Sequence, residues 1–397
     1  MKKLEKYKWI CPQPFTNIHV HIRGEMKPCC TMDYSPEMQK FPDIEIHNIE
    51  ESSFKEYYHS ETMKRLRNAM RNENDDEYVY AMCGKCSRVE ESGNRSQRQY
   101  YVNRFNNEFK DKKEELERII AEDAEPTFLH SFEFKPLVSN KCNLACNMCG
   151  SEWSTRYFAE SIKLGEVEKQ KTILSPDISP KAWEEMPEIL SKLEEIKLAG
   201  GEPLMSEDTY RMLEMIPNPE NKRLKIITNG TINPERFIEH AKKFKSVDVN
   251  ISVEGIPSIT EYIRYPSKWN EVEENYHKFN EIARTRFVST VNALNVGTSP
   301  EFHEFMEDKG YLFSQNNPVV NNPYKLASIP PELRDIYLNK LYSAKLKNII
   351  RFLEYAEYDE SEMFKMLSHI KRRDRLRKRC LIDVMPEWKP YYDKVIV

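Results

Sequence analysis

The clearest pattern in the chain is an alternation of short apolar strands with amphipathic helices, which begins near residue 132. The predicted strands are residues 132–138, 196–199, 224–228, 247–253, 287–294 and 311–314. The predicted helices are residues 154–164, 182–194, 207–215, 234–244, 269–284 and 300–309. Repeated strand-helix units of this kind predict a parallel sheet that curls into a partial (βα)6 barrel like part of a TIM barrel. A flat doubly wound sheet is the alternative, which periodicity alone does not exclude.

The segments on either side of this pattern differ from it. Before the barrel, the chain is irregular, with a predicted strand at 17–22, a helical stretch at 53–71 and a charged helix at 107–124. After residue 316, a Pro/Asn-rich crossing leads into mostly helical sequence. We therefore expect an α+β module with a linker helix at 1–125, an α/β barrel at 126–316 and a helical C-terminal extension at 317–397.

Composition argues against several classes of binding partner but identifies none. The chain has 397 residues, with 60 Lys and Arg against 64 Asp and Glu, and its formal net charge is −4. Such a balance gives no overall attraction to nucleic acid or to an anionic membrane. No apolar run reaches the length of about 18 residues that a membrane span needs, and the first residues do not look like a signal peptide. We expect a soluble, cytoplasmic protein without a membrane partner, and nucleic acid is not the expected partner.

Nine cysteines are unevenly spaced along the chain. In a reducing compartment, bunched thiols usually hold a metal or a cluster rather than form disulfides. Cys142, Cys146 and Cys149 follow the first barrel strand, where the active-site loops of a barrel lie. Three thiolates spaced CxxxCxxC can bind three corners of a four-iron cluster and leave the fourth iron open to a ligand. A zinc knuckle is the alternative, but no fourth Cys or His lies nearby in the sequence.

This loop resembles the cluster-binding loop of the radical SAM superfamily, with Met148 where the family usually has an aromatic residue. Further motifs resemble those of the family in the expected order on later strand ends. Gly200, Gly201, Glu202 and Pro203 resemble its GGEP motif, Thr228 and Asn229 its TNG motif, and Ser252, with Glu254 in place of Asp, its SxDG motif. Arg264 stands where the family often carries an arginine that pairs with the methionyl carboxylate.

The resemblance implies the cofactors and the residues that contact them. It implies a [4Fe-4S] cluster on Cys142, Cys146 and Cys149, with S-adenosylmethionine bound at its open iron. The implied contacts to S-adenosylmethionine come from the loop and the following strand ends: Met148, Gly200, Gly201, Glu202, Pro203, Thr228, Asn229, Ser252 and Arg264.

A second cysteine set lies in the first region. Cys11, Gly24 and Cys29, followed by Cys83 and Cys86, resemble the opening of the auxiliary-cluster modules called SPASM and twitch. The resemblance implies one further [4Fe-4S] cluster on these four thiols, with zinc in a four-cysteine ribbon as the alternative. Cys30 and Cys380 are the expected bystanders. Such modules generally follow the barrel, whereas these cysteines precede it.

The predicted function is that of a radical SAM enzyme. The resemblance implies reductive cleavage of S-adenosylmethionine to a 5′-deoxyadenosyl radical, which abstracts hydrogen from a substrate. An electron donor such as flavodoxin or ferredoxin is then an implied partner. The auxiliary module favours a peptide or protein side chain as substrate. The alternatives are a small nucleotide or sugar derivative, favoured by the basic run at 371–379, and a non-catalytic iron-sulfur or zinc protein that acts as a redox sensor or scaffold.

Overall fold

The computed structural model describes residues 10–32, 36–91, 93, 95–134, 139–167, 177–319 and 322–396. The last residues of the first predicted barrel strand, 135–138, lie outside these ranges. Within the described ranges, no helix is long and apolar enough to cross a membrane.

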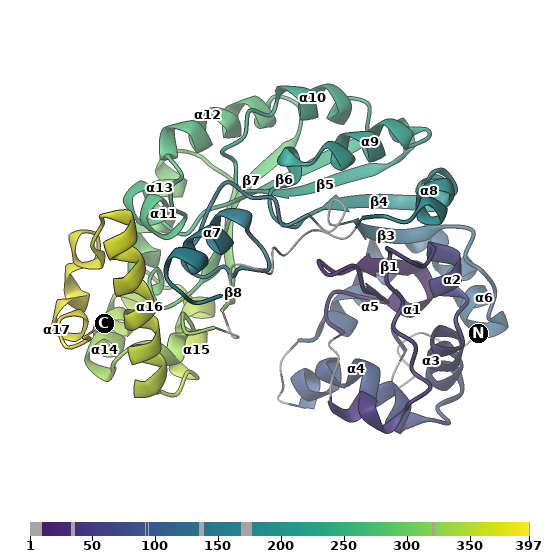
Figure 1. The fold of residues 1–397 in the computed structure, drawn as a ribbon, viewed down its shortest axis with the longest axis horizontal. Coiled ribbons are helices and arrows are strands. Elements are labelled where there is room, and N and C mark those ends of the chain that lie inside the picture. The colour runs from purple at the N-terminus through teal and green to yellow at the C-terminus, as the bar shows by residue number, and fades with distance from the viewer. Residues whose placement is uncertain are drawn as a thin grey trace.

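One eight-stranded sheet organises the molecule, in the order β2-β1-β3-β4-β5-β6-β7-β8 (Figure 1). The β1–β2 pair is antiparallel, and every other neighbouring pair is parallel. The strands are β1 (Asn17–Val20), β2 (Met26–Lys27), β3 (Leu129–Phe134), β4 (Leu193–Leu198), β5 (Arg223–Thr228), β6 (Ser246–Ser252), β7 (Arg284–Val291) and β8 (Phe313–Pro318).

The six predicted barrel strands are all present as β3 to β8, which confirms the α/β fold class. The sheet nevertheless has two strands more than the barrel alone predicts, because the first region contributes β1 and β2. β1 lies parallel to β3, with Asn17 opposite Ser131. The N-terminal module is therefore joined to the barrel edge by a strand ladder, a long-range pairing that local periodicity does not reveal.

Amphipathic helices cover one face of the barrel strands (Figure 1). Along β6, Val247, Val249 and Ile251 are buried and alternate with half-buried or exposed residues, as expected of strands with one face under helices. The covering helices are α8 (Pro180–Lys192), α9 (Glu207–Met215), α10 (Glu235–Ala241), α11 (Pro257–Ile263), α12 (Trp269–Asn280) and α13 (Ser299–Asp308). Helix α7 (Thr155–Lys163) lies beside α16 (Glu360–Arg377) of the C-terminal region, to which Glu160 is joined by an ion pair with Arg377.

The helices of the N-terminal module differ in two places from the sequence prediction. The predicted helix 53–71 is interrupted at His59 and Ser60, and the Ser60 side chain caps the second piece by accepting a hydrogen bond from the Met63 amide. The predicted helix 107–124 begins only at Lys113. The helices are α1 (Gln13–Thr16), α2 (Phe54–Tyr58), α3 (Glu61–Asn72), α4 (Asp76–Glu91), α5 (Gln97–Asn107) and α6 (Lys113–Glu122).

A buried ion pair fastens this module to the barrel. Arg104 on α5 donates to Glu195 on β4 at 3.0 Å, and Lys225 on β5 lies 2.9 Å from the same carboxylate. The Glu195 side chain is only 2% exposed. Burial would raise the pKa of Glu195, but the Arg104 and Lys225 charges lower it to about 2. The apolar core is also shared, because buried residues of the module and the barrel form one packed cluster.

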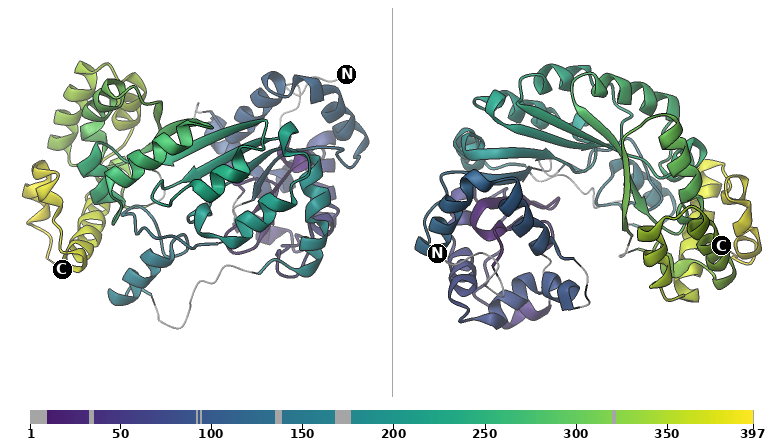
Figure 2. Two further views of the ribbon diagram at one scale, coloured as in Figure 1. Left: turned by 90° about the horizontal axis from the view of Figure 1, so that it is seen from above. Right: turned by 180° about the vertical axis from the view of Figure 1, so that it is seen from behind.

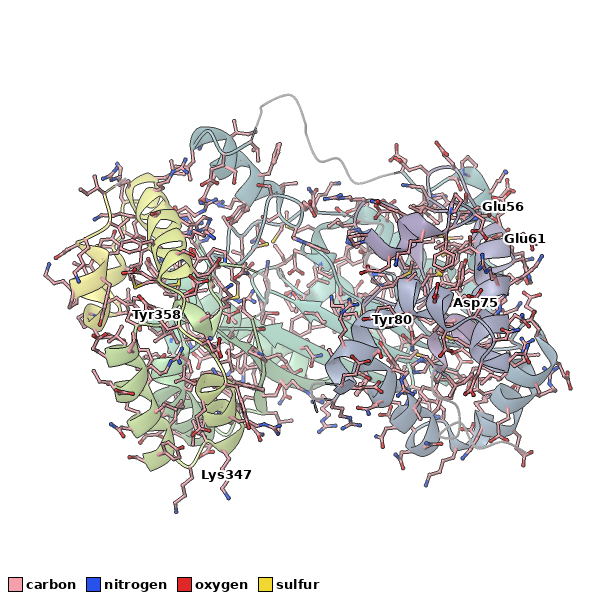
Figure 3. The ribbon with its side chains drawn as sticks, turned by 90° about the horizontal axis from the view of Figure 1, so that it is seen from below. Glu56, Glu61, Asp75, Tyr80, Lys347 and Tyr358 are labelled. Atoms are coloured by element: carbon pink, nitrogen blue, oxygen red, sulfur yellow. The ribbon has the colours of Figure 1, made fainter. Side chains whose placement is uncertain are left out.

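The C-terminal extension forms a second packed region at the opposite end of the molecule (Figure 2). Its core includes Tyr262 and Ile263 of α11 and Leu294 after β7, so it is built onto the barrel. In the view from below, Asp75 and Tyr80 mark the N-terminal module, and Lys347 and Tyr358 mark the extension (Figure 3). Its helices are α14 (Pro331–Ser343), α15 (Lys347–Glu354), α16 (Glu360–Arg377) and α17 (Lys389–Tyr392).

The Arg104→Ala variant tests how the module is held. It leaves the Glu195 carboxylate buried with one cationic partner fewer, so we expect a loss of about 2–4 kcal/mol in the free energy of unfolding. Arg118→Ala is the control, because it removes an exposed pair with Glu122 and should cost less than about 0.5 kcal/mol. Urea unfolding followed by circular dichroism measures both. Equal losses in the two variants would contradict the role of the buried pair.

Candidate functional site

The three thiols after β3 lie together on a loop without helix or strand. Burial raises the pKa of Cys146 to about 12 and that of Cys149 to about 11, and it also raises the pKa of Cys142. The charges of Cys149 and Cys142 raise the pKa of Cys146 further. Thiols with raised pKa values stay protonated until a metal displaces their protons, and three thiols on one loop are a ligand set that an iron-sulfur cluster can use.

Backbone hydrogen bonds from other parts of the barrel fix this loop. The amide of Ala145 donates to the Tyr265 carbonyl at 2.7 Å, and the amide of Asn147 donates to the Ile263 carbonyl at 2.8 Å. On the α7 side, the Thr155 hydroxyl accepts from the Cys142 amide at 3.2 Å. The end of α11 and the start of α7 thus determine where the three sulfurs lie.

The glycine pair after β4 lets the next loop approach the cluster loop closely. A Cβ atom on Gly201 would lie 2.5 Å from the Lys141 carbonyl oxygen, a contact that no side chain could make without moving the backbone. The amide of Glu202 donates to that same carbonyl at 2.7 Å. Gly200 has a φ of 148°, and Pro203 is buried where a short 3-10 turn begins. The predicted GGEP motif thus forms a tight turn whose backbone lies against that of the cluster loop.

The Glu202 carboxylate is buried and ties two strand ends together. It accepts hydrogen bonds from the Thr228 hydroxyl at 2.8 Å, the Asn229 amide at 2.7 Å and the Leu204 amide at 3.2 Å. Burial raises the pKa of Glu202 to about 7 despite these bonds. Its oxygens hold the ends of β4 and β5 in register, a role that the motif alone does not reveal.

Asn229 connects the end of β5 to the cluster loop. Its Nδ2 donates to Asn143 Oδ1 at 2.9 Å and lies 3.9 Å from Cys142 Sγ. Asn143 in turn donates to the Thr231 hydroxyl at 2.8 Å. Sequence reasoning missed Asn143 and Thr231, although both stand beside motif residues.

Arg264 lies against both a thiol and a buried carboxylate. Its Nη1 is 3.9 Å from Cys146 Sγ, while Nε and Nη2 contact Glu254 at 3.1 and 2.9 Å. Glu254 is 1% exposed, and burial raises its pKa to about 7. Asn292 and Asn295 each donate to its second oxygen at 3.4 Å. The sequence showed Glu254 only as a replacement for Asp, whereas its longer side chain reaches Arg264.

The remaining predicted contacts lie around the same loop. Ser252 is the last residue of β6 and is half-buried. The Met148 carbonyl accepts from Asn322 Nδ2 at 3.0 Å, and its side chain packs against the core of the C-terminal extension. The predicted site residues therefore lie on the cluster loop, at or after the carboxyl ends of β4, β5 and β6, and, in the case of Arg264, at the end of α11.

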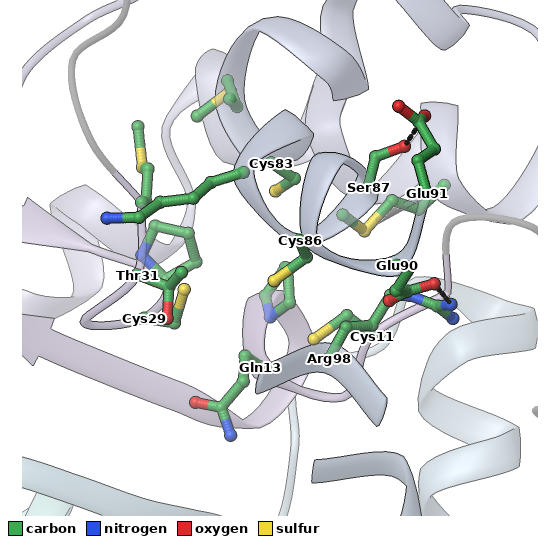
Figure 4. Close-up of a pocket in the computed structure, with 16 residues that line it drawn as sticks. Cys11, Gln13, Cys29, Thr31, Cys83, Cys86, Ser87, Glu90, Glu91 and Arg98 are labelled. Atoms are coloured by element: carbon green, nitrogen blue, oxygen red, sulfur yellow. Dashed lines mark hydrogen bonds and ion pairs between the residues drawn. The ribbon is translucent and has the colours of Figure 1, made fainter. Parts of the chain in front are cut away.

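The second cysteine set surrounds a cavity of about 340 Å³ in the N-terminal module (Figure 4). Cys11 precedes α1, Cys29 follows β2, and Cys83 and Cys86 lie one turn apart on α4. Cys30 is exposed and does not line the cavity, and Cys380 packs in the C-terminal extension. The division of these cysteines into ligands and bystanders stays a prediction.

The chemistry of the cavity suits a cluster. Burial raises the pKa of Cys11 to about 12 and raises those of Cys29 and Cys83 well above their usual value. The wall between the thiols is mostly apolar, with Met32 and Met82 among its residues. Four thiols around a space of this volume leave room for several iron and sulfur atoms.

The two cysteine sites are linked through the turn between β1 and β2. Arg23 in this turn forms an ion pair with Glu152, three residues beyond Cys149. The rings of His21 and Trp153 meet edge to face at 5.6 Å between centroids. The module that carries the second cysteine set therefore touches the segment that follows the first.

The basic run at 371–379 is engaged in contacts within the chain. Lys371 donates to the carbonyls of Tyr392 and Val395, and Arg379 donates to the carbonyl of Glu261. Arg372 donates to the Leu164 carbonyl, while Arg373 and Arg377 pair with Glu166 and Glu160. Much of the charge that suggested an anionic substrate is thus used to dock α16.

Two family models match the chain. Residues 137–308 match the radical SAM superfamily model, and residues 11–87 match the model of the iron-sulfur cluster-binding SPASM domain. The first match contains the cluster loop and the motifs after it, and the second contains Cys11, Cys29, Cys83 and Cys86.

Curated relatives match only parts of the chain. A probable GTP 3′,8-cyclase of Methanocaldococcus jannaschii is 27% identical over 188 residues, which are 44% of this chain and 55% of that protein. The GTP 3′,8-cyclase of Aquifex aeolicus is 30% identical over 25% of this chain and 28% of its own. The 7-carboxy-7-deazaguanine synthase of Clostridium acetobutylicum is 28% identical over 24% and 37%. Each match spans less than two thirds of the relative.

Solved structures show distant similarity. Native anSMEcpe with bound AdoMet has a TM-score of 0.40 and 16% identity, over 60% of this chain and 65% of its own. SuiB of Streptococcus suis bound to S-adenosylmethionine has a TM-score of 0.38 and 15% identity, over 84% and 69%.

Gly201→Ala tests the contact between the β4 loop and the cluster loop. The added Cβ would displace backbone atoms of residues 140 and 141, so we expect S-adenosylmethionine binding to weaken about tenfold or more. Gly150→Ala is the control, because its Cβ would make only an ordinary contact of 3.7 Å with Trp153. Equilibrium dialysis of the reconstituted proteins measures the Kd. Unchanged binding in Gly201→Ala would refute the importance of this contact.

Proposed function

Because this chain is an enzyme of the radical SAM superfamily that also carries a SPASM-type iron-sulfur module, we propose that it modifies the side chain of a peptide or protein. When bound, a reduced [4Fe-4S] cluster and S-adenosylmethionine supply methionine and a 5′-deoxyadenosyl radical, which takes a hydrogen atom from the substrate. The proposed electron donor is a small carrier such as flavodoxin or ferredoxin, and the proposed location is the cytoplasm.

We assign the first cluster to Cys142, Cys146 and Cys149. Their place on one loop after β3, and their raised pKa values, support this assignment. No fourth thiol belongs to the loop, so one iron is left for S-adenosylmethionine. The proposed contacts to S-adenosylmethionine lie on the loop and the strand ends beside it: Met148, Gly200, Gly201, Glu202, Pro203, Thr228, Asn229, Ser252 and Arg264.

Within this set, several residues already make contacts in the protein. Glu202 and Thr228 hydrogen-bond to each other and hold the strand ends, so their proposed effect on the cofactor is through backbone position. Gly201 leaves space for the backbone of the cluster loop, Ser252 is half-buried at the end of β6, and the Met148 side chain packs against the C-terminal extension. Arg264 already pairs with Glu254, so a bound methionyl carboxylate would share its guanidinium with that buried acid.

We assign the auxiliary cluster to Cys11, Cys29, Cys83 and Cys86. The observation that carries the proposed function is that all four thiols line one cavity. A cluster held by four thiolates has no open iron, which suits it to passing electrons rather than to binding substrate directly. Abstraction of hydrogen leaves an unpaired electron on the substrate, and oxidation or crosslinking of a side chain requires an acceptor for that electron. We propose the auxiliary cluster as this acceptor.

We further propose that the module, the barrel and the extension keep the boundaries 1–125, 126–316 and 317–397. The shared core and the β1–β3 ladder support a module docked rigidly on the barrel rather than a tethered one. We therefore expect the substrate to meet both cluster sites without a large movement of the module.

A nucleotide or nucleotide-derived substrate is the second candidate. Identity to GTP 3′,8-cyclases over part of the chain favours it. The contacts of the basic run at 371–379 argue against a nucleotide substrate, because Lys371, Arg373 and Arg377 already bind other groups of the chain. The four-thiol cavity is the stronger observation, and it favours the peptide substrate.

Reconstitution under anaerobic conditions tests the cluster assignments. We expect about eight irons per chain, the content of two four-iron clusters, and formation of 5′-deoxyadenosine after reduction with S-adenosylmethionine present. Cys146→Ala should abolish 5′-deoxyadenosine formation, whereas Cys83→Ala should lower the iron content and leave that formation measurable. About four irons with one zinc would indicate a zinc ribbon instead. Undiminished 5′-deoxyadenosine from Cys146→Ala would refute the catalytic assignment.

Deuterium transfer tests the substrate class. Peptides encoded near this gene and uniformly deuterated at their side chains should yield deuterated 5′-deoxyadenosine, detected by mass spectrometry. GTP deuterated on its ribose serves as the second arm. Transfer from the nucleotide and not from any peptide would overturn the proposed substrate while leaving the radical SAM assignment intact.

A further inference from the structure

The C-terminal extension reaches directly into the cluster loop through one arginine. Arg377, the last residue of α16, donates from Nη2 to the Ala145 carbonyl at 2.6 Å and from Nη1 to Asn147 Oδ1. Ala145 and Asn147 flank Cys146, and Asn147 precedes Met148. No sequence motif marks this contact, because the residues are more than 200 positions apart.

The same side chain is anchored to α7. Its Nε and Nη2 contact the Glu160 carboxylate at 3.1 and 2.7 Å. The side chains of Arg377 and Glu160 are 4% and 10% exposed. A guanidinium presents donors in a planar fork and can serve a carboxylate, a carbonyl and an amide oxygen at once, which an ammonium on a single stem cannot do.

Neighbouring contacts of the extension act on the same loop. Asn322 donates to the Met148 carbonyl at 3.0 Å. The ring of Tyr265, whose carbonyl accepts from the Ala145 amide, lies 4.8 Å from the guanidinium carbon of Arg377 and 4.9 Å from that of Arg379. The peptide groups around Cys146 are thus held on one side by the α11 end and on the other by the extension.

A loop without secondary structure needs such contacts if its sulfurs are to stay in place. Groups behind the ligands fix ligand orientation, and loose support costs metal or cofactor affinity. Arg377 holds the two residues on either side of Cys146, and Asn322 holds the residue proposed to contact the bound S-adenosylmethionine.

From these contacts we propose that Arg377 is a positioning residue for the cluster loop, through which the C-terminal extension completes the S-adenosylmethionine site. The inference rests on the proposed function of Cys142, Cys146 and Cys149. It gives one arginine of the basic run a role in holding the cluster loop, in place of a role in binding an anionic substrate.

The test compares Arg377→Ala with a matched variant of the same helix. Arg373→Ala removes a buried pair with Glu166, at 2.7 Å, that docks α16 without touching the loop. The measurements are iron content, the Kd for S-adenosylmethionine, the change in the electron paramagnetic resonance spectrum of the reduced protein when S-adenosylmethionine is added, and the thermal unfolding temperature.

We expect Arg377→Ala to raise the Kd for S-adenosylmethionine about tenfold and to diminish the spectral change. Arg373→Ala should lower the unfolding temperature but keep the Kd within about twofold of the wild-type value. Arg377→Lys should be intermediate, because its ammonium can keep Glu160 but cannot reach both loop oxygens.

Wild-type Kd and spectral change in Arg377→Ala would overturn the proposal, as would equal effects on the Kd in Arg377→Ala and Arg373→Ala. If Arg377→Ala does not fold, Asn147→Ala removes the amide acceptor and leaves the Arg377–Glu160 pair in place. A raised Kd in that variant supports the proposal, and an unchanged Kd overturns it. If wild-type protein takes up no cluster at the loop, the proposed function fails and this inference fails with it.

Discussion

The cluster loop after β3 forms neither helix nor strand. One turn of its own runs from the Cys149 amide to the Cys146 carbonyl at 2.9 Å, and the site depends on how the other peptide groups of the loop are satisfied. A buried backbone group without a partner costs free energy comparable to a lost hydrogen bond. The Lys141 carbonyl is taken by Glu202, the Ala145 amide by Tyr265 and the Ala145 carbonyl by Arg377. Each partner comes from a different element, so three separate parts of the fold must be in place before the loop that carries the three thiols takes this conformation. This requirement explains why a glycine is needed at 201, where any side chain would separate two of these parts.

The topology also accounts for the contact between the two cysteine sites. β1 and β3 are parallel neighbours, so their carboxyl ends lie at the same edge of the sheet. The β1–β2 turn and the cluster loop leave these two ends, which brings Arg23 to Glu152 and His21 to Trp153. The same hairpin then leads into Cys29. An auxiliary module that precedes the barrel in sequence can therefore lie close to the catalytic loop, because strand pairing sets its position and chain order does not.

Local signals were sufficient to predict much of this molecule. The alternation of short apolar segments with amphipathic ones located the barrel strands, and thiol spacing together with turn glycines located the candidate ligands. Contacts between distant parts of the chain could not be read in this way. The β1–β3 pairing, the Arg264–Glu254 pair and the Arg377 contact each join residues whose local surroundings are ordinary. The basic run at 371–379 shows the same limit, because charge density along a sequence does not tell whether the partner carboxylates and carbonyls lie within the chain.

Polar side chains outside the basic run also occur along the barrel strands. The half-buried positions of the barrel strands alternate with those packed under the helices, and they include Lys225, Asp248, Asn250 and Arg286. Arg286 lies 3.6 Å from Asp248, and the Asn250 side-chain oxygen is buried without a protein partner among the described residues. The sheet face that the helices leave uncovered thus carries polar and charged side chains, one of which, Lys225, already pairs with Glu195. The residues proposed to contact the cofactors belong to motifs that a whole family can share while its members act on different molecules.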